Sequence, residues 1–132
     1  MSVAGERDGL NGARVLVVED EMLITMLLED ILDELGCRVV GSAVNLRQAE
    51  DLVRSTEAEA AILDVNLGGD PVFPVAEALL QRKIPFIFAS GYGSASLPEK
   101  WQNFPTLPKP FTADQVADTL RNVLRDRDRA SA

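Results

Sequence analysis

The sequence predicts an α/β fold in which five strands form a doubly wound parallel sheet and five helices cover it. Short apolar runs alternate with segments whose apolar residues recur every three to four positions, which is the pattern of strands followed by helices. The apolar runs also stop abruptly at polar residues, as when a buried parallel strand delivers one side chain to the edge of its sheet. Residues 60–63 show this most clearly, because the run ends at Asp64 and a turn at Gly68-Gly69 follows. The alternation implies right-handed crossovers that place helices on both faces.

The length and composition are those of one globular domain. The chain has 132 residues, of which 46% are apolar and 26% are charged, and this is long enough to bury a core. No apolar run approaches the roughly 20 residues of a membrane span. Residues 1–9 also lack the basic start and apolar core of a signal peptide. We therefore expect a cytoplasmic protein that does not contact membranes.

Charge and missing residue types exclude several function classes. A net charge of −8 disfavours direct binding to nucleic acid or anionic membranes, because both need a basic surface. The sequence contains no histidine, which excludes histidine zinc sites, Ser-His-Asp hydrolysis and any histidine general base. Cys37 is the single cysteine, and we interpret it as a small buried hydrophobe.

Each expected strand is followed by an expected helix. The strands are expected at residues 14–18, 37–43, 60–64, 84–90 and 104–108. The helices are expected at residues 21–35, 45–54, 74–83, 96–103 and 112–124. We expect a flexible N-terminal arm at residues 1–12, one domain at residues 13–127 and a frayed tail at residues 128–132.

Capping residues support these helix boundaries. Asn45 and Thr112 each precede a glutamine by three positions, as in N-terminal caps. Pro74 suits the first turn of a helix, where a proline costs little. The fourth helix begins near a Ser96 cap and must be short, because Pro105 lies directly beyond it.

The apolar spacing predicts which side of the first and last helices faces the sheet. The first helix is expected to bury Leu23, Leu27, Ile31 and Leu35, and to end at Gly36. The last is expected to bury Val116, Leu120, Val123 and Leu124. We interpret Met22, Met26 and Trp101 as core or edge packing residues, and Trp101 also as a candidate docking residue.

Polar side chains follow four of the expected strands. Glu19 and Asp20 come after the first strand, and Asp64 ends the third. Ser90 ends the fourth strand, and Lys109 follows the fifth. Because the carboxyl ends of parallel strands meet at one edge, where open α/β sheets bind ligands, we expect these five side chains to form one pocket.

The three carboxylates of this pocket predict a metal. Carboxylates that share one site repel each other, and a hard divalent cation bound through oxygen would keep all three ionised. Mg²⁺ fits better than Ca²⁺, because it needs only one or two carboxylates beside waters and phosphate oxygens. Asp64 would then be able to attack phosphorus and become an aspartyl phosphate, with Ser90 and Lys109 sharing the phosphoryl oxygens with the metal.

These motifs resemble the receiver domain of bacterial two-component response regulators. The matching segments are residues 17–21 (Val-Val-Glu-Asp-Glu), 63–65 (Leu-Asp-Val), 90–91 (Ser-Gly) and 109–111 (Lys-Pro-Phe). The resemblance covers residues 13–127, and it implies a flavodoxin-like fold with strand order 2-1-3-4-5.

The resemblance also implies a role for each residue of the pocket. Asp64 would be the phosphoacceptor, with Glu19 and Asp20 as metal ligands. Ser90 would be the switch hydroxyl and Lys109 the family's lysine. Asn66 matches the position whose backbone carbonyl binds the metal, and its side chain would face the phosphoryl group and influence hydrolysis.

The chain departs from the commonest receiver pattern around the switch. Thr106 stands where most receivers carry an aromatic residue, three positions before the lysine. Residues 85–93 (Pro-Phe-Ile-Phe-Ala-Ser-Gly-Tyr-Gly) instead resemble the variant receivers named after their FATGUY motif, with Ser90 in place of that motif's threonine. Tyr92 is then the candidate for the moving aromatic residue.

The resemblance implies a signalling protein rather than an enzyme. We expect a stand-alone response regulator that takes a phosphoryl group from a histidine kinase or a His phosphotransfer protein, with Mg²⁺, and then binds a downstream protein. One alternative is a phosphatase of the haloacid dehalogenase type, but that family has a second Asp where this chain has Asn66, which cannot act as acid or base. Another is a constitutive binding module whose pocket is never phosphorylated, although the intact pocket argues against it.

Overall fold

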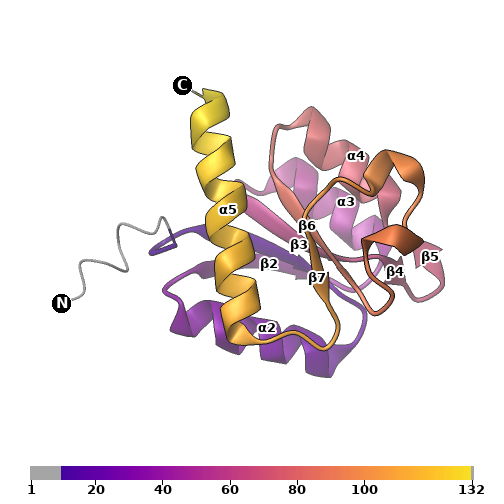
Figure 1. Cartoon of the computed structure of the whole chain (residues 1–132), viewed down its shortest axis with the longest axis horizontal. Helices are drawn as coiled ribbons and strands as arrows, with labels where there is room; N and C mark the ends of the chain where they lie inside the picture. Colours follow the sequence, from indigo (N-terminus) through magenta and orange to yellow (C-terminus); the bar gives the residue numbers. More distant parts are fainter. Residues whose placement is uncertain (1–9, 132) are drawn as a thin grey trace.

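The fold is a five-stranded parallel sheet with helices on both faces, seen in a computed structural model that describes residues 10–131 (Figure 1). The strands of this sheet are β1 (Arg14–Val18), β2 (Arg38–Ala43), β3 (Ala60–Asp64), β6 (Phe86–Ser90) and β7 (Thr106–Pro108). The helices are α2 (Met22–Glu34), α3 (Leu46–Ser55), α4 (Phe73–Gln81) and α5 (Ala113–Ser131). The predicted fold class is therefore confirmed.

The strand order is β2-β1-β3-β6-β7, with every neighbouring pair parallel. This is the predicted order 2-1-3-4-5 once a small separate ribbon, β4 (Asn66–Leu67) with β5 (Asp70–Pro71), is set aside. The order reverses at β1, which pairs with β2 on one side and with β3 on the other. A binding crevice is expected at this reversal, beyond the carboxyl ends of β1 and β3.

The two faces of the sheet bury separate cores. Helices α2 and α5 cover one face, where Val15 and Val17 of β1 join an aliphatic cluster. Helices α3 and α4 cover the other face, where Leu16 and Val18 of β1 join a cluster rich in aromatic side chains. The alternation along β1 shows why its sequence is continuously apolar, since both of its faces are buried.

The expected fourth helix, residues 96–103, is not an α-helix. Two single 3₁₀ turns, Ser94–Ser96 and Glu99–Trp101, take its place. Pro98 lies between them in extended conformation and has no N–H to continue a helix. The described chain therefore has four α-helices and not the expected five, while Trp101 is buried as expected.

Helix α2 turns a different side to the sheet from the one that the spacing predicted. Its buried side chains are Leu28, Ile31 and Leu32, whereas Leu23 is 79% exposed. Leu27 is also exposed, and so are Met22 and Met26, which we had interpreted as packing residues. The first two turns of this helix are apolar on nearly every side, so the period alone did not distinguish the buried stripe from the exposed one.

At both ends of the described chain, structured residues extend beyond residues 13–127. Leu10 is buried in the core, and the Gly12 N–H donates to the Gly36 carbonyl, so packing begins inside the segment that we assigned to a flexible arm. Residues 1–9 of that arm lie outside the described residues. At the other end, α5 continues as helix to Ser131, and the fraying of residues 128–132 stays a prediction. None of the helices between residues 10 and 131 has the length and apolar composition of a membrane span.

We predict that Leu28→Ala lowers the free energy of unfolding by about 2–5 kcal/mol, because it leaves a cavity in the core. Leu23→Ala, on the exposed side of the same helix, is the matched control and should change it by less than about 0.5 kcal/mol. Urea unfolding of the two variants measures the difference. Equal losses would contradict the observed orientation of α2.

Candidate functional site

Three carboxylates meet where the order of the sheet reverses. Glu19 and Asp20 follow β1, and Asp64 is the last residue of β3. One oxygen from each of the three lies within 4.8 Å of the other two. Glu19 and Asp64 are buried, while Asp20 faces solvent. The structure therefore brings together the three predicted acidic residues.

Lys109 supplies the positive charge that this cluster lacks. Its Nζ lies 2.8 Å from Glu19 Oε1 and 3.3 Å from Asp64 Oδ1. The Lys109 backbone N–H donates to the Ser90 carbonyl, 3.1 Å away, which fixes the end of β7 against the end of β6. One ammonium group is thus divided between two buried carboxylates.

This imbalance shifts the pKa of Asp64. Burial raises the pKa of its carboxyl, and the negative charge of Glu19 raises it further. The charge of Lys109 works in the opposite direction, but the net result is a pKa raised to about 7. In the metal-free protein, Asp64 therefore takes up a proton near neutral pH.

The neighbouring groups shift toward their charged forms. Burial works to lower the pKa of Lys109, but its hydrogen bond with Glu19 and the charges of Asp64 and Glu19 outweigh burial, so its pKa is raised. Burial works to raise the pKa of Asp20, yet hydrogen bonds from Asp64 and from the Gly68 N–H lower it overall. The pKa of the Asp64 carboxyl is thus raised, while that of the neighbouring Asp20 is lowered.

A backbone ribbon holds the exposed carboxylate in place. The Gly68 N–H donates to Asp20 Oδ2 at 2.8 Å, and the Gly69 N–H donates to Asn66 Oδ1 at 2.9 Å. Gly68 and Gly69 have φ angles of 58° and 99°, which let β4 and β5 form a tight antiparallel hairpin. Sequence reasoning predicted the turn but missed the ribbon and the role of the Gly68 N–H, although Asn-x-Gly-Gly-Asp carries a hairpin signal.

Asn66 is oriented by this ribbon. Its backbone N–H donates to Asp64 Oδ1 over 3.3 Å, and its side-chain oxygen accepts from Gly69. The side chain that we expected to face a phosphoryl group is therefore engaged in its own turn. Its backbone carbonyl as a metal ligand stays a prediction.

Of the three predicted switch residues, Ser90 and Tyr92 border the site, whereas Thr106 does not line it. Ser90 is buried, and its Oγ accepts from the Tyr92 backbone N–H at 3.1 Å. The Tyr92 side chain is 88% exposed and points to solvent. Thr106, in β7, is half-buried and donates through its hydroxyl to the Phe104 carbonyl at 3.1 Å.

A cavity of about 530 Å³ lies at this edge of the sheet, and Glu19 and Thr106 are not among its lining residues. The cavity is bordered by Asp20, Asp64, Asn66, Ser90, Tyr92 and Lys109. The acidic residues offer only oxygen atoms as metal ligands. The open side of the cavity leaves room for waters and a phosphoryl group. This donor set fits Mg²⁺, which binds through few carboxylates and keeps part of its hydration shell. Glu19, Asp20 and Asp64 are the side chains that would hold it.

Comparison with known families agrees with this geometry. A model of the response regulator receiver domain matches residues 15–121. This chain belongs to the response regulator receiver family. The match includes the carboxyl ends of β1, β3, β6 and β7, where the site residues lie.

Curated relatives include proteins of two sizes. The chain is 31% identical to the sensory transduction protein LytT of Bacillus subtilis (strain 168), over 82% of this chain and 46% of LytT. It is 26% identical to the chemotaxis protein CheY of Thermotoga maritima, over 85% of this chain and 98% of CheY. The chain thus spans about half the length of relatives such as LytT.

Solved structures include receivers with the same fold. The solution structure of SdrG from Sphingomonas melonis Fr1 has a TM-score of 0.77 and 46% identity, covering 86% of this chain and 97% of SdrG. The receiver domain of the PhyR response regulator from Erythrobacter litoralis has a TM-score of 0.78 and 28% identity, covering 89% of this chain and 93% of that domain. The assignment to the FATGUY subgroup stays a prediction.

We predict that the metal-free protein becomes more stable as pH falls through 7. The pKa of Asp64 is about 7 in the folded chain and 3.8 ordinarily, so the folded state binds this proton more tightly. Between about pH 8 and pH 5 the free energy of unfolding should rise by about 2–3 kcal/mol, at ~1.4 kcal/mol per pKa unit.

Urea unfolding in the presence of a chelator measures this rise. Asp64→Asn is the control, because it removes the titrating group and keeps its shape. The variant should be more stable than the wild type above neutral pH and should lack most of the rise. Parallel pH profiles for the two proteins would contradict the prediction.

Proposed function

We propose that this chain is a phosphoacceptor in two-component signalling, with Asp64 as the residue that is phosphorylated. The single observation that carries the proposal is the juxtaposition of Asp64 with two further carboxylates and Lys109 at the switch point of a receiver fold. Mg²⁺ would be held by Glu19, Asp20 and Asp64, with the Asn66 backbone carbonyl. When bound, it supplies the positive charge that keeps the three carboxylates ionised and neutralises phosphoryl oxygens.

The chemical step is a transfer from phosphohistidine to a carboxylate. An oxygen of Asp64 attacks phosphorus, the new O–P bond forms, and the P–N bond of the donor breaks with its electron pair returning to the imidazole. Lys109 is placed to pair with a phosphoryl oxygen, because its Nζ already lies 3.3 Å from the attacking carboxylate. The donor is a histidine kinase or a His phosphotransfer protein.

Phosphorylation also gives Ser90 a second possible partner. The Ser90 hydroxyl is a donor, and a phosphoryl oxygen on Asp64 is a stronger acceptor than the groups around it in the unmodified site. If Ser90 turns toward the phosphoryl group, the Tyr92 N–H loses its present acceptor. Tyr92 and Thr106 are therefore the positions through which we propose that the outer loop responds.

An apolar surface beside the site supports docking of another protein. Met22, Leu23, Met26 and Leu27 expose their side chains along α2, which starts two residues after Asp20. Exposed Val44 adjoins Ala43, whose carbonyl accepts from the Glu19 N–H. Apolar patches rimmed by polar residues typically mark protein contacts. We propose that the phosphodonor protein covers this surface while it delivers the phosphoryl group to Asp64.

The output is proposed to be phosphorylation-dependent binding of a downstream protein. A BeF₃-activated conformation has been solved for SdrG from Pseudomonas melonis Fr1, with 46% identity over 84% of this chain. An anti-anti-sigma factor, PhyR of Bartonella quintana, has a TM-score of 0.80 and 26% identity over 97% of this chain and 54% of PhyR. These likenesses support a partner that belongs to a sigma-factor regulatory system.

The two alternatives are less well supported. A phosphatase of the haloacid dehalogenase type needs an acid or base at position 66, where the Asn66 amide instead accepts from Gly69. A constitutive binding module would not require a lysine paired with two buried carboxylates.

Acetyl phosphate with Mg²⁺ tests the proposal. We expect intact-mass measurement to show one added phosphoryl group on the wild type and none after chelation of the metal. Asp64→Asn should take up none, while Asp70→Asn, an exposed Asp on the adjacent ribbon, should behave as the wild type does.

A short-lived adduct would escape this measurement, so beryllofluoride with Mg²⁺ is the second arm. Amide NMR shifts around Asp64, Ser90 and Lys109 would support the proposal even without a mass adduct. If neither reagent acts, the chain is a constitutive binding module.

A further inference from the structure

The β4–β5 ribbon contacts two of the three carboxylates that would hold the metal. The Gly68 N–H donates to Asp20 Oδ2 at 2.8 Å, and the Asn66 backbone N–H donates to Asp64 Oδ1 at 3.3 Å. These two carboxylates come from different strands, because Asp20 follows β1 and Asp64 ends β3. The ribbon therefore links two proposed metal ligands through its own backbone.

The bond from the ribbon limits how the Asp20 carboxylate is oriented. Asp20 is exposed, so packing alone does not fix its side chain. The Gly68 N–H contacts its Oδ2 and not its Oδ1, and the distance of 2.8 Å is typical of the stronger bonds that N–H groups make with ionised acceptors. Mg²⁺ demands near-ideal octahedral geometry, and its affinity depends on the groups that orient its ligands.

The Asn66 side chain holds the ribbon in the shape that presents this N–H group. Its Oδ1 accepts from the Gly69 N–H at 2.9 Å and so closes the turn across Gly68. The two glycines have positive φ angles of 58° and 99° and little conformational preference of their own. Leu67 anchors the ribbon to the core, since it is only 3% exposed. The tip of the ribbon is thus the part that depends on Asn66.

We propose that Asn66 is a positioning residue for Mg²⁺, whose side chain fixes the Gly68 N–H and thereby orients the carboxylate of Asp20. The inference rests on the proposed function, since that function assigns Asp20 to the metal. It differs from the role that the receiver resemblance implies for this side chain, which is contact with a phosphoryl group. Asn66 should therefore affect Mg²⁺ affinity when no phosphoryl group is present.

Titration of MgCl₂ into the metal-free chain, followed by amide NMR, measures this affinity without a phosphodonor. Loss of a group that orients a metal ligand typically weakens binding by about 10- to 100-fold. Asn66 acts one hydrogen bond further away, so Asn66→Ala should raise the Kd about 3- to 10-fold. Asn66→Ser should recover part of the loss, because a serine hydroxyl accepts from nearby backbone N–H groups more weakly.

Two results for Asn66→Ala would overturn the proposal. An unchanged Kd would show that the side chain has no part in metal binding. A lower Kd would show that the ribbon holds Asp20 away from the metal.

Double variants show whether Asn66 acts through Asp20. Asp20→Asn has a single side-chain oxygen, which accepts from Gly68 or faces the metal but cannot do both. Adding Asn66→Ala to it should therefore change the Kd by less than about 2-fold. In Glu19→Gln the bond from Gly68 is kept, and Asn66→Ala should have its full effect. Equal effects in the two backgrounds would contradict a route through Asp20.

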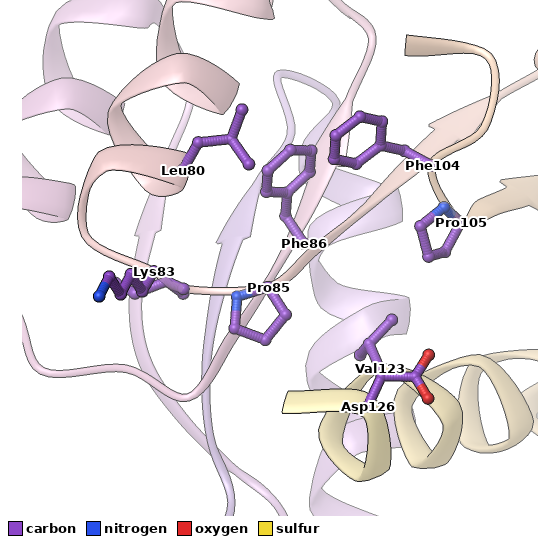
Figure 2. A pocket seen from close by; sticks show the side chains of 9 residues that line it. Leu80, Lys83, Pro85, Phe86, Phe104, Pro105, Val123 and Asp126 are labelled. Atoms are coloured by element: carbon purple, nitrogen blue, oxygen red, sulfur yellow. The ribbon is translucent and has the colours of Figure 1, made fainter. Parts of the chain in front are cut away.

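Two single variants control for effects unrelated to the ribbon. Asn122→Ala removes an exposed asparagine from α5. Leu80→Ala shortens a side chain at the opposite end of the sheet, beside an apolar cavity of about 320 Å³ between Phe86 and Val123 (Figure 2). Both should bind Mg²⁺ as the wild type does. A Kd raised as much as in Asn66→Ala would attribute that variant's effect to general destabilisation and overturn the proposal.

Failure of this proposal is distinguishable from failure of the proposal for Asp64. If the wild type and Asn66→Ala bind Mg²⁺ equally and the wild type takes up a phosphoryl group, only the role of Asn66 is wrong. If Asn66→Ala weakens Mg²⁺ binding but neither acetyl phosphate nor beryllofluoride acts on the wild type, only the phosphoacceptor proposal is wrong. A wild type that binds no Mg²⁺ would overturn both.

Discussion

Three carboxylates meet at the carboxyl edge of this sheet, but one lysine is shared between only two of them, and the rest of the site depends on that imbalance. Lys109 contacts Glu19 at 2.8 Å and Asp64 at 3.3 Å, and it cannot neutralise both. The carboxylates of Glu19 and Asp20 are held in place, because they accept hydrogen bonds from the backbone N–H groups of Glu21 and Gly68. The residual negative charge falls on Asp64, and it can be relieved by a proton or by a divalent cation.

The two halves of the site are built differently, which suits a switch. Glu19 and Asp20 directly follow β1 and Asp64 ends β3, and these are central strands that are paired on both sides and buried on both faces. Ser90 and Tyr92 lead instead into two 3₁₀ turns interrupted by Pro98. Short elements with few hydrogen bonds open more easily than central strands. The metal-binding half is therefore the fixed part, and the outer loop is the part that we expect to move.

The sheet and most of the site could be predicted from sequence because local signals and tertiary context agree there. The apolar runs that end at Asp64 and Ser90 form strands that are buried on both faces, so the sequence places them in the interior of the sheet. The buried side of α2 could not be predicted, because Leu23 and Leu28 are equally apolar and only contact with the sheet distinguishes them. Nothing in the sequence of one chain shows whether a partner covers the exposed leucines of α2.

The structure also differs from the sequence-based prediction where one residue or one hydrogen bond overrides a local sequence pattern. Ser96 with Glu99 matches a capping box, yet Pro98 prevents the helix that such a cap would start. The ribbon at Gly68 depends on two residues with positive φ and on a hydrogen bond to Asp20, 48 positions away in sequence. The cavity between Phe86 and Val123 joins segments that are distant along the chain. Its existence follows only from packing.

Calorimetric titration of Mg²⁺ into the metal-free protein tests the charge imbalance most directly. Because Asp64 holds a proton near neutral pH, binding at about pH 6 should be weaker than at about pH 8 and should release close to one proton, detectable as a dependence of the heat on the buffer's ionisation enthalpy. Asp64→Asn should release no proton. Affinity that is independent of pH, without proton release from the wild type, would contradict the central claim that Asp64 carries the unbalanced charge of the site.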